Sequence, residues 1–208
     1  MSAITPSGNV FIASMNMRGK WAVEPSGATK INVTSAQAKL SKNRRDFSPM
    51  TEVQGGYKGY WSFENYWQSG KVFEDIPDEK TKKWWKSLTE SKRRYPKTKG
   101  KKVLYAKFEN EVQQMDYITS RKEIYIPEYF NLIKDREMLS NWKKYIDAGN
   151  DVVIYDFDGP RGKDRELMCL PVNLELLKEK INDPIFPFGH GYIIAGYLSG
   201  ILPDEYII

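Results

Sequence analysis

The segment NDVVIYDFDG (150–159) is the clearest β-strand signal in this chain and does most to limit its fold. A short run of Val, Ile, Tyr and Phe ends there in two acids and Gly159. The apolar run 9–15 is consistent with a buried first strand. Strand and helix signals mix along the chain without an internal repeat. The sequence therefore predicts one α+β or α/β domain over residues 1–208, with a small mixed sheet surrounded by helices.

Local signals place the other elements. Ser62 stands where an N-cap belongs, ahead of a helix expected from 63 to about 74. Pro127 and Gly149 bracket a second helix, as a first-turn proline and a C-terminal glycine do. Further strands are expected near 30–34 and at 103–109, and further helices after Pro77, at 172–183 and in the C-terminal segment.

Size and residue content exclude several classes of protein. The 208 residues, 40% of them hydrophobic, suit one sizeable domain. No apolar run approaches the roughly 18 residues of a membrane span, and the first residues lack a signal-peptide pattern. A cytoplasmic protein without a membrane partner is therefore expected. A single cysteine, Cys169, and a single histidine, His190, exclude a disulfide framework and argue against structural zinc. No cofactor and no obligatory metal are expected.

Residues 80–107 form a strongly basic segment. It holds twelve Lys and Arg against one acid, Glu90, a net charge of +11, so the rest of the chain carries −6 of the total of +5. Such a segment is either a solvated loop or a surface for phosphates and nucleic acid. Its tryptophans, Trp84 and Trp85, either stack on exposed bases or anchor a helix to the core. The candidate nucleic-acid contacts are Lys82, Lys83, Lys86, Arg93, Arg94, Lys101 and Lys102.

The stretch GYWSFENYWQSGKVFED (59–75) surrounds one acid with aromatic residues. At helical spacing, Glu64, Trp67 or Gln68, and Lys71 share one face. That face is either an exposed Glu–Lys surface with the aromatics in the core, or a wall that carries Glu64 into an aromatic pocket. Partial burial there would tend to raise the pKa of the Glu64 carboxyl, and Lys71 would oppose the shift.

The segment 47–74, with FSPM and then GGYKGYWSFENYWQSGKVFE, resembles the signature of the NADAR-type N-glycosidases, a superfamily that acts on riboflavin intermediates and ADP-ribosyl-guanine. Asn65 stands where that family typically has histidine. NVTS (32–35) and WQSGKV (67–72) also fit an uncharacterised branch, so the resemblance covers roughly residues 30–75. The matching positions are Phe47, Ser48, the glycine turn, Ser62, Glu64, Gln68 and Lys71.

The resemblance implies cleavage of a bond between ribose and nitrogen. It implies that Glu64 is catalytic, aided by a tryptophan, which corresponds to Trp67, and by a later aspartate. Breaking such a bond develops oxocarbenium character at the sugar, which a carboxylate can stabilise. Trp67 would stack on the departing base, and Gln68 and Lys71 would position the substrate.

Asp156 and Asp158 are the candidates for the later aspartate, because they follow the strand at 150–159 and point to the same side. The alternative is an acidic turn, and two acids without a clear third make a weak Mg²⁺ site. Arg161 is a candidate phosphate or ribose clamp. His190, between two glycines ahead of a helix, is either a phosphate or proton-shuttling residue or a packed turn residue. Arg18 and Arg45 are candidate phosphate ligands in loops.

The leading hypothesis is an N-glycosidase acting on a nucleotide-type substrate, with an ADP-ribosyl or modified-base adduct on nucleic acid as one form of it. A non-catalytic DNA- or RNA-binding protein that keeps a nucleotide pocket is the main alternative. A transferase that passes the sugar to another acceptor would use the same residues.

Overall fold

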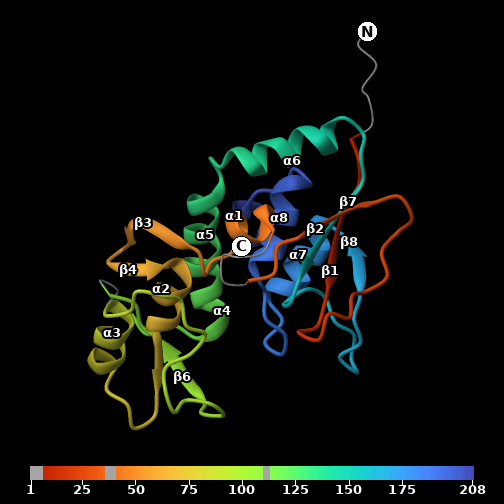
Figure 1. Ribbon diagram of the computed structural model, residues 1–208. Coiled ribbons are helices and arrows are strands. Elements are labelled where there is room, and N and C mark those ends of the chain that lie inside the picture. Colours follow the sequence, from red (N-terminus) through yellow and green to blue (C-terminus); the bar gives the residue numbers. More distant parts are fainter. Residues whose placement is uncertain (1–6, 36–40, 110–112) are drawn as a thin grey trace.

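The computed structural model describes residues 7–35, 41–109 and 113–208 (Figure 1). Its main sheet has the strand order β2-β7-β1-β8. Strands β1 (Val10–Ser14), β2 (Thr29–Asn32) and β7 (Val152–Asp156) run parallel, and β8 (Cys169–Pro171) runs antiparallel to β1. Every residue of β7 is buried, because the strand lies in the middle of the sheet. The α+β fold with a small mixed sheet is confirmed.

Helices cover this sheet and supply much of the core. The helix α8 (His190–Leu198) packs on β1 and β7 and is buried along nearly all its length, as its apolar sequence requires. It also contacts α5 (Ile126–Ile133), α6 (Glu137–Asp147), α7 (Leu174–Ile181) and α9 (Pro203–Tyr206). The N-terminus of α8 thereby lies next to the carboxyl end of β7, where Asp156 stands.

A second group of elements lies across the α4–α5 column from the sheet, on the left in Figure 1. It contains the antiparallel pair β3 (Glu52–Tyr57) and β4 (Tyr60–Ser62). The short helix α1 (Lys42–Phe47) lies on the sheet side of the column, close to β2. Helix α2 (Phe63–Ser69) leads into the strand β5 (Lys71–Phe73). This strand pairs with β6 (Val103–Ala106), and the helix α3 (Asp78–Lys86) lies between the two strands in the sequence. Aromatic rings from α2 pack against Tyr125 and Tyr129 of the central column.

The central column is one helical run of three parts. The short helix α4 (Tyr117–Ser120) continues into a π-helical turn, η1 (Arg121–Tyr125), and then into α5. A π turn rotates the side chains that follow it relative to a regular helix, and such turns are frequent at functional sites. Here the turn begins with Arg121 and ends with Tyr125, both of which line the cavities described below.

Two helix predictions were too long. Helix α2 ends at Ser69 rather than near residue 74, and Lys71 lies on a strand. A Cβ atom on Gly70 would stand 2.4 Å from the ring of Phe108, so the tight turn into β5 depends on this glycine. The segment 127–149 divides into α5 and α6, and the helical run begins earlier, at Tyr117. No glycine or proline marks the break near Arg136. Within the described residues, no helix has the length and apolar character that crossing a membrane requires.

Candidate active site

Two small cavities meet between α2, the π turn, the end of β7 and the start of α8. The histidine-side cavity, of about 150 Å³, is lined by Pro49, Met50, Arg93, Asp156 and His190 among others. The tryptophan-side cavity, of about 140 Å³, is lined by Trp67, Gln68, Lys71, Arg121 and Phe188 among others. Glu64, Tyr125 and Asp158 line both. The structure therefore brings Glu64, Trp67 and Asp158 around one space, which is called here the central site.

The Glu64 carboxylate is oriented by its own helix. Ser62 caps α2 by accepting a hydrogen bond from the Asn65 backbone N–H at 3.2 Å. One turn along, the Gln68 side-chain amide donates to Glu64 Oε1 at 2.7 Å. The other carboxylate oxygen, Oε2, has no hydrogen-bond partner among the described residues. One oxygen is thus held by the protein, and the other is available to a substrate or a water molecule.

Aromatic rings form one wall of the central site. Trp67 is 9% exposed, stacks on Phe108 with ring centroids 5.6 Å apart, and lies 4.9 Å from the Tyr125 ring. This packing fixes the plane of the indole. Burial, together with the negative charge of Glu64, raises the pKa of Tyr125 well above its ordinary value. Tyr125 therefore remains a neutral hydroxyl at physiological pH.

The two aspartates at the end of β7 have different surroundings. Asp156 is 2% exposed, and its Oδ1 accepts from the Phe157 N–H at 2.7 Å. Its Oδ2 accepts from the Gly191 N–H at 3.0 Å. Asp158 is open to the cavities, but protein surrounds its other sides. That partial burial, and then the negative charge of Asp156, raise the pKa of Asp158 to about 6, although His190 opposes the shift.

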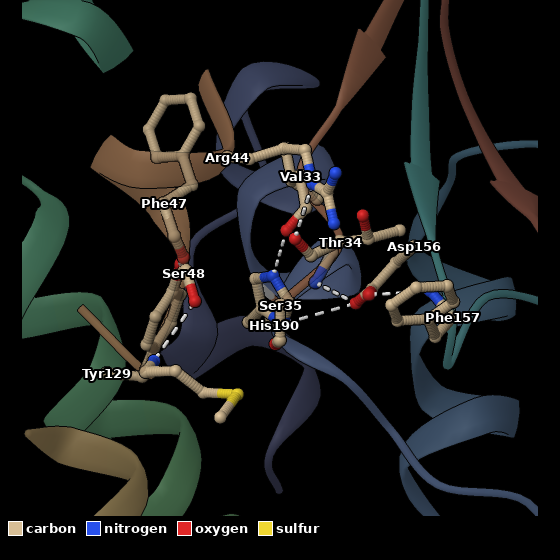
Figure 2. A network of polar contacts seen from close by, with 12 residues as sticks. Val33, Thr34, Ser35, Arg44, Phe47, Ser48, Tyr129, Asp156, Phe157 and His190 are labelled. Carbon is tan, nitrogen blue, oxygen red and sulfur yellow. Dashed lines mark hydrogen bonds and ion pairs between the residues drawn. The ribbon is translucent and has the colours of Figure 1, made fainter. Parts of the chain in front are cut away.

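His190 links the start of α8 to the sheet (Figure 2). Its Nε2–H donates to the Val33 carbonyl at 2.6 Å, and its Nδ1 lies 3.2 Å from Asp156 Oδ2. The glycines on either side allow this close approach. A Cβ atom on Gly189 or on Gly191 would lie 2.7 Å from an aspartate atom, of Asp156 or Asp158. Both ring nitrogens of His190 are engaged, so this histidine holds Asp156 in place.

Lys71 and Arg93 bring positive charge to the central site. The Lys71 ammonium makes no hydrogen bond or ion pair with any residue that the structure describes. Burial lowers the pKa of Lys71, and the charges of Glu64 and Asp158 oppose the decrease. Arg93 donates to the Ser35 carbonyl at 3.1 Å and lies over the Phe157 ring, 5.8 Å from its centroid. Through Arg93 the basic segment reaches the rim of the site.

A third cavity, of about 450 Å³, adjoins the central site at Asp158 and is called here the arginine cavity. Arg93, Arg161 and Arg165 line it. Arg161 Nη2 donates to the carbonyls of Met15 at 3.2 Å and Phe157 at 3.1 Å, which fixes the guanidinium at the wall. Of the candidate clamps, Arg161 thus lies near the carboxylates.

Arg18 and Arg45 lie elsewhere. Both are exposed, and neither lines the cavities described here. On α1, the side chain that turns inward is the neighbouring Arg44, whose Nε donates to the Thr34 carbonyl at 3.1 Å. Figure 2 shows this arginine beside Thr34, close to the His190 network. Which of two adjacent arginines on a short helix turns inward depends on how that helix docks, which the sequence does not reveal.

The remaining cations of the basic segment lie outside the central site. Lys82 pairs with Asp78 at 3.2 Å, and Lys86 pairs with Glu109 at 2.6 Å. Trp85 is 1% exposed, so it anchors α3 to the core and cannot stack on a base. Trp84 packs edge-on against Tyr95. Lys86 is exposed despite its ion pair, and the other exposed candidates outside the site are Lys83, Arg94, Lys101 and Lys102.

Three site residues escaped sequence reasoning: Tyr117, Arg121 and Tyr125. All come from the α4–η1 run, whose position depends on long-range packing. The aromatic run EIYIPEYF (123–130) is the available signal, but the first-turn proline predicts a helix that begins only at Pro127, after Tyr125. Asn65 also has a role that its motif position did not indicate. Its amide donates to the Glu90 carbonyl at 2.9 Å and accepts from the Lys92 N–H at 3.2 Å, which fastens the basic segment to α2.

The described residues contain no group of three or more His, Cys, Asp or Glu side chains that could hold a metal ion. The side chains that line the two cavities include three carboxylic acids, a lysine, two arginines, two tyrosines, a histidine and a tryptophan: Glu64, Asp156, Asp158, Lys71, Arg93, Arg121, Tyr117, Tyr125, His190 and Trp67. No protein-family model matches the chain, and neither the curated proteins nor the solved structures include a significantly similar one.

Proposed function

We propose that this protein is an N-glycosidase that cleaves the bond between ribose and nitrogen in a nucleotide-type substrate. The observation that carries the proposal is that Glu64 and Asp158 line the same two cavities, with Trp67 and Tyr125 as the aromatic wall. The resemblance of residues 30–75 to NADAR-type N-glycosidases supports the same activity. A nucleotide-type substrate is consistent with an activity in the cytoplasm.

Each group then has a role in the reaction. As the C1′–N bond breaks, its electron pair leaves with the nitrogen, and positive charge develops at C1′ and the ring oxygen. The free oxygen of Glu64 stabilises that charge. A water molecule attacks C1′ and gives a proton to Asp158, whose pKa of about 6 leaves it mostly ionised at neutral pH. The departing nitrogen takes a proton from Lys71, which recovers it from solvent.

The surrounding residues favour a phosphorylated substrate. Arg93 stands at the rim of the central site and also lines the arginine cavity, with Arg161 and Arg165. Guanidinium groups bind phosphate oxygens in bidentate fashion. A ribose between Glu64 and Asp158 would therefore direct its phosphates toward these arginines.

The Glu64→Gln variant tests the proposal, because glutamine keeps the shape of the side chain and removes its charge. The assay follows release of free base from ribonucleoside phosphates and from ADP-ribosylated DNA, with separation of the products by chromatography. We expect the variant to keep its melting temperature and to lose activity by roughly 100-fold or more. Glu52→Gln, at an exposed position on β3, is the matched control and should retain full activity. Full turnover by Glu64→Gln on a substrate that the wild type cleaves would refute the assignment.

Non-catalytic binding of nucleic acid is a second candidate, favoured by the exposed Lys83, Arg94, Lys101 and Lys102. These residues belong to the segment that Asn65 fastens to α2. This candidate requires binding that weakens steeply with salt and no release of base from any substrate. The same chromatographic assay therefore separates the two functions.

A further inference from the structure

A fourth cavity, of about 360 Å³, lies beyond the aromatic wall of the central site and is called here the apolar cavity. Its walls are the strands β5 and β6 and the helix α4. Trp67, Lys71 and Tyr117 line both this cavity and the tryptophan-side cavity, so the two meet at these three side chains. The other lining residues are Val103, Leu104, Tyr105, Ala106, Phe108 and Ser120. None of the roles assigned above uses this space.

The walls of the apolar cavity expose an unusual amount of hydrophobic surface. Val103 is 38% exposed, Leu104 49% and Tyr117 45%. Exposure of apolar side chains to water is unfavourable, and covering them with an apolar ligand lowers the free energy. Scattered exposed hydrophobic residues need no explanation, but these line one cavity together. A ligand with an apolar face would cover them.

Among the described residues that line this mainly apolar cavity, Lys71 is the one with a charged side chain. Within the described residues it has neither a hydrogen-bond acceptor nor an acidic partner in range. Burial there lowers the pKa of Lys71, so the group is under-solvated as well as unpaired. A ligand that offers one acceptor atom at this end and an apolar surface elsewhere would satisfy both the lysine and the exposed side chains.

We propose that the apolar cavity binds the heteroaromatic leaving group of the substrate, with its ring beside Trp67 and one ring acceptor atom on the Lys71 ammonium. This inference rests on the proposed function, since the ribose would lie between Glu64 and Asp158 in the adjoining central site, where the two cavities meet. A purine or pyrimidine ring has the needed combination of a flat apolar face and edge acceptors. Pockets for small molecules begin at about 300 Å³, so the cavity has room for one base.

The arrangement divides the substrate by chemistry. The arginine cavity lies on the Asp158 side of the central site and would take the phosphates. The apolar cavity lies on the Trp67 side and takes the base. The bond to be cleaved then lies between them, at the two carboxylates.

The test measures binding of free bases, which does not depend on catalysis. Adenine, cytosine and nicotinamide at millimolar concentration are titrated by calorimetry into wild type, Glu64→Gln, Leu104→Trp, Lys71→Met and Leu202→Trp. We expect wild type and Glu64→Gln to bind at least one base equally. Leu104→Trp, which fills the cavity, should weaken that binding at least 10-fold, and Lys71→Met should weaken it several-fold. Leu202→Trp changes a leucine of similar exposure, 46%, outside the lining residues, and should have no effect.

The proposal is overturned if no base binds, or if Leu104→Trp and Lys71→Met bind as tightly as wild type. Thermal melts identify a Leu104→Trp protein that does not fold, and Leu104→Glu, which places a charge at the same exposed position, then carries the test. If these variants lose base binding but the wild type cleaves no N-glycoside, the base site is supported and the proposed glycosidase activity is refuted. If the wild type releases base, Glu64→Gln does not, and no free base binds in this cavity, the glycosidase activity is supported and the base site is refuted.

Discussion

His190 bridges two acceptors: its Nε2–H donates to the Val33 carbonyl at 2.6 Å, and its Nδ1 lies 3.2 Å from Asp156 Oδ2. A neutral imidazole has only one N–H, so it cannot donate to both. The contact between Nδ1 and Asp156 Oδ2 is therefore an ion pair only when the imidazole carries both protons. The pair ties the end of β2, the end of β7 and the start of α8 together beneath the histidine-side cavity.

Replacing His190 with phenylalanine should destabilise the fold by about 3 kcal/mol. Phenylalanine keeps the edge contact with Tyr129, 5.6 Å between centroids, but leaves Val33 and Asp156 without this donor. His190→Asn places an amide near the position of Nδ1 and should recover part of the loss. Urea unfolding at pH 7 measures both. Equal stability of the Phe and Asn variants would show that the contact with Asp156 contributes nothing.

Gly191→Ala should destabilise the protein by roughly 1–3 kcal/mol, although alanine normally favours a helix. Its Cβ atom would lie 2.7 Å from Asp156 Cβ and 2.9 Å from Oδ2, so the aspartate must move. Gly196→Ala, in the same helix, is the control, because its nearest neighbour is the end of a leucine side chain at 3.1 Å. Denaturant titrations of the two variants should differ clearly. A neutral Gly191→Ala would mean that Asp156 has room that the structure does not show.

Asp158→Asn should raise the melting temperature at pH 7 to 8. The folded-state pKa of Asp158, about 6, exceeds the ordinary value of 3.8, so the folded protein binds its proton more tightly than the unfolded chain. The ionised carboxylate therefore costs stability, which declines as the pH rises from about 4 to 6 and stays reduced above that window. The gain from asparagine should shrink as the pH falls through the same window and vanish below pH 4. Asp164→Asn, at another exposed position, is the control that removes one negative charge away from the aspartate pair. A gain of the same size at pH 3 and pH 8 would contradict the crowding of Asp158 by Asp156.

Arg121→Met should cost about 3 kcal/mol or more, because the buried guanidinium donates to several carbonyls at once. Its acceptors are the oxygens of Lys180 at 3.2 Å, Ile181 at 2.9 Å, Asp183 at 3.1 Å and Phe186 at 3.2 Å. They belong to the end of α7 and to the loop that leads to the tryptophan-side cavity. Lys122→Met, one position along, removes a cation without these contacts and should be near neutral. Comparable melting temperatures for the two variants would exclude the anchoring role of Arg121.

Binding of single-stranded DNA, if present, should depend on the exposed cations of the basic segment. Simultaneous replacement of Lys83, Arg94, Lys101 and Lys102 by glutamine should reduce the slope of log affinity against log salt by about 2 to 3, at roughly 0.7 for each phosphate that is no longer neutralised. The control replaces four exposed lysines elsewhere, Lys20, Lys134, Lys163 and Lys178, with the same change in net charge. Fluorescence anisotropy at several salt concentrations gives the slopes. Equal slopes in the two quadruple variants would mean that net charge, rather than this surface, determines binding.

The sequence was most informative where burial is continuous. Strands β1 and β7 lie side by side in the middle of the sheet, so their apolar runs were sufficient to identify them. The sequence was least informative where a helix or strand ends because of a contact with a residue that is distant in the sequence. The turn at Gly70 depends on Phe108, which is distant in the sequence, and the predicted helix therefore continued too far.

The candidate site shows the same division. Glu64 and Gln68 were placed on one face by helical spacing, and their side chains are 2.7 Å apart. Lys71 matched that spacing too, but it lines the same cavity from a strand. Tyr125 and Arg121 could not be found, because a π turn sets their direction and no short sequence pattern predicts one.

Asn65 stands where the glycosidase signature that this segment resembles has histidine, and it tethers the basic segment through Glu90 and Lys92. Arg93 follows directly after the tethered residue and reaches the rim of the central site. Any force that a bound polyanion exerts on this segment is therefore transmitted through two hydrogen bonds to the helix that carries Glu64. If the basic segment binds a polyanion, Asn65 couples that binding to the helix that positions the Glu64 carboxylate.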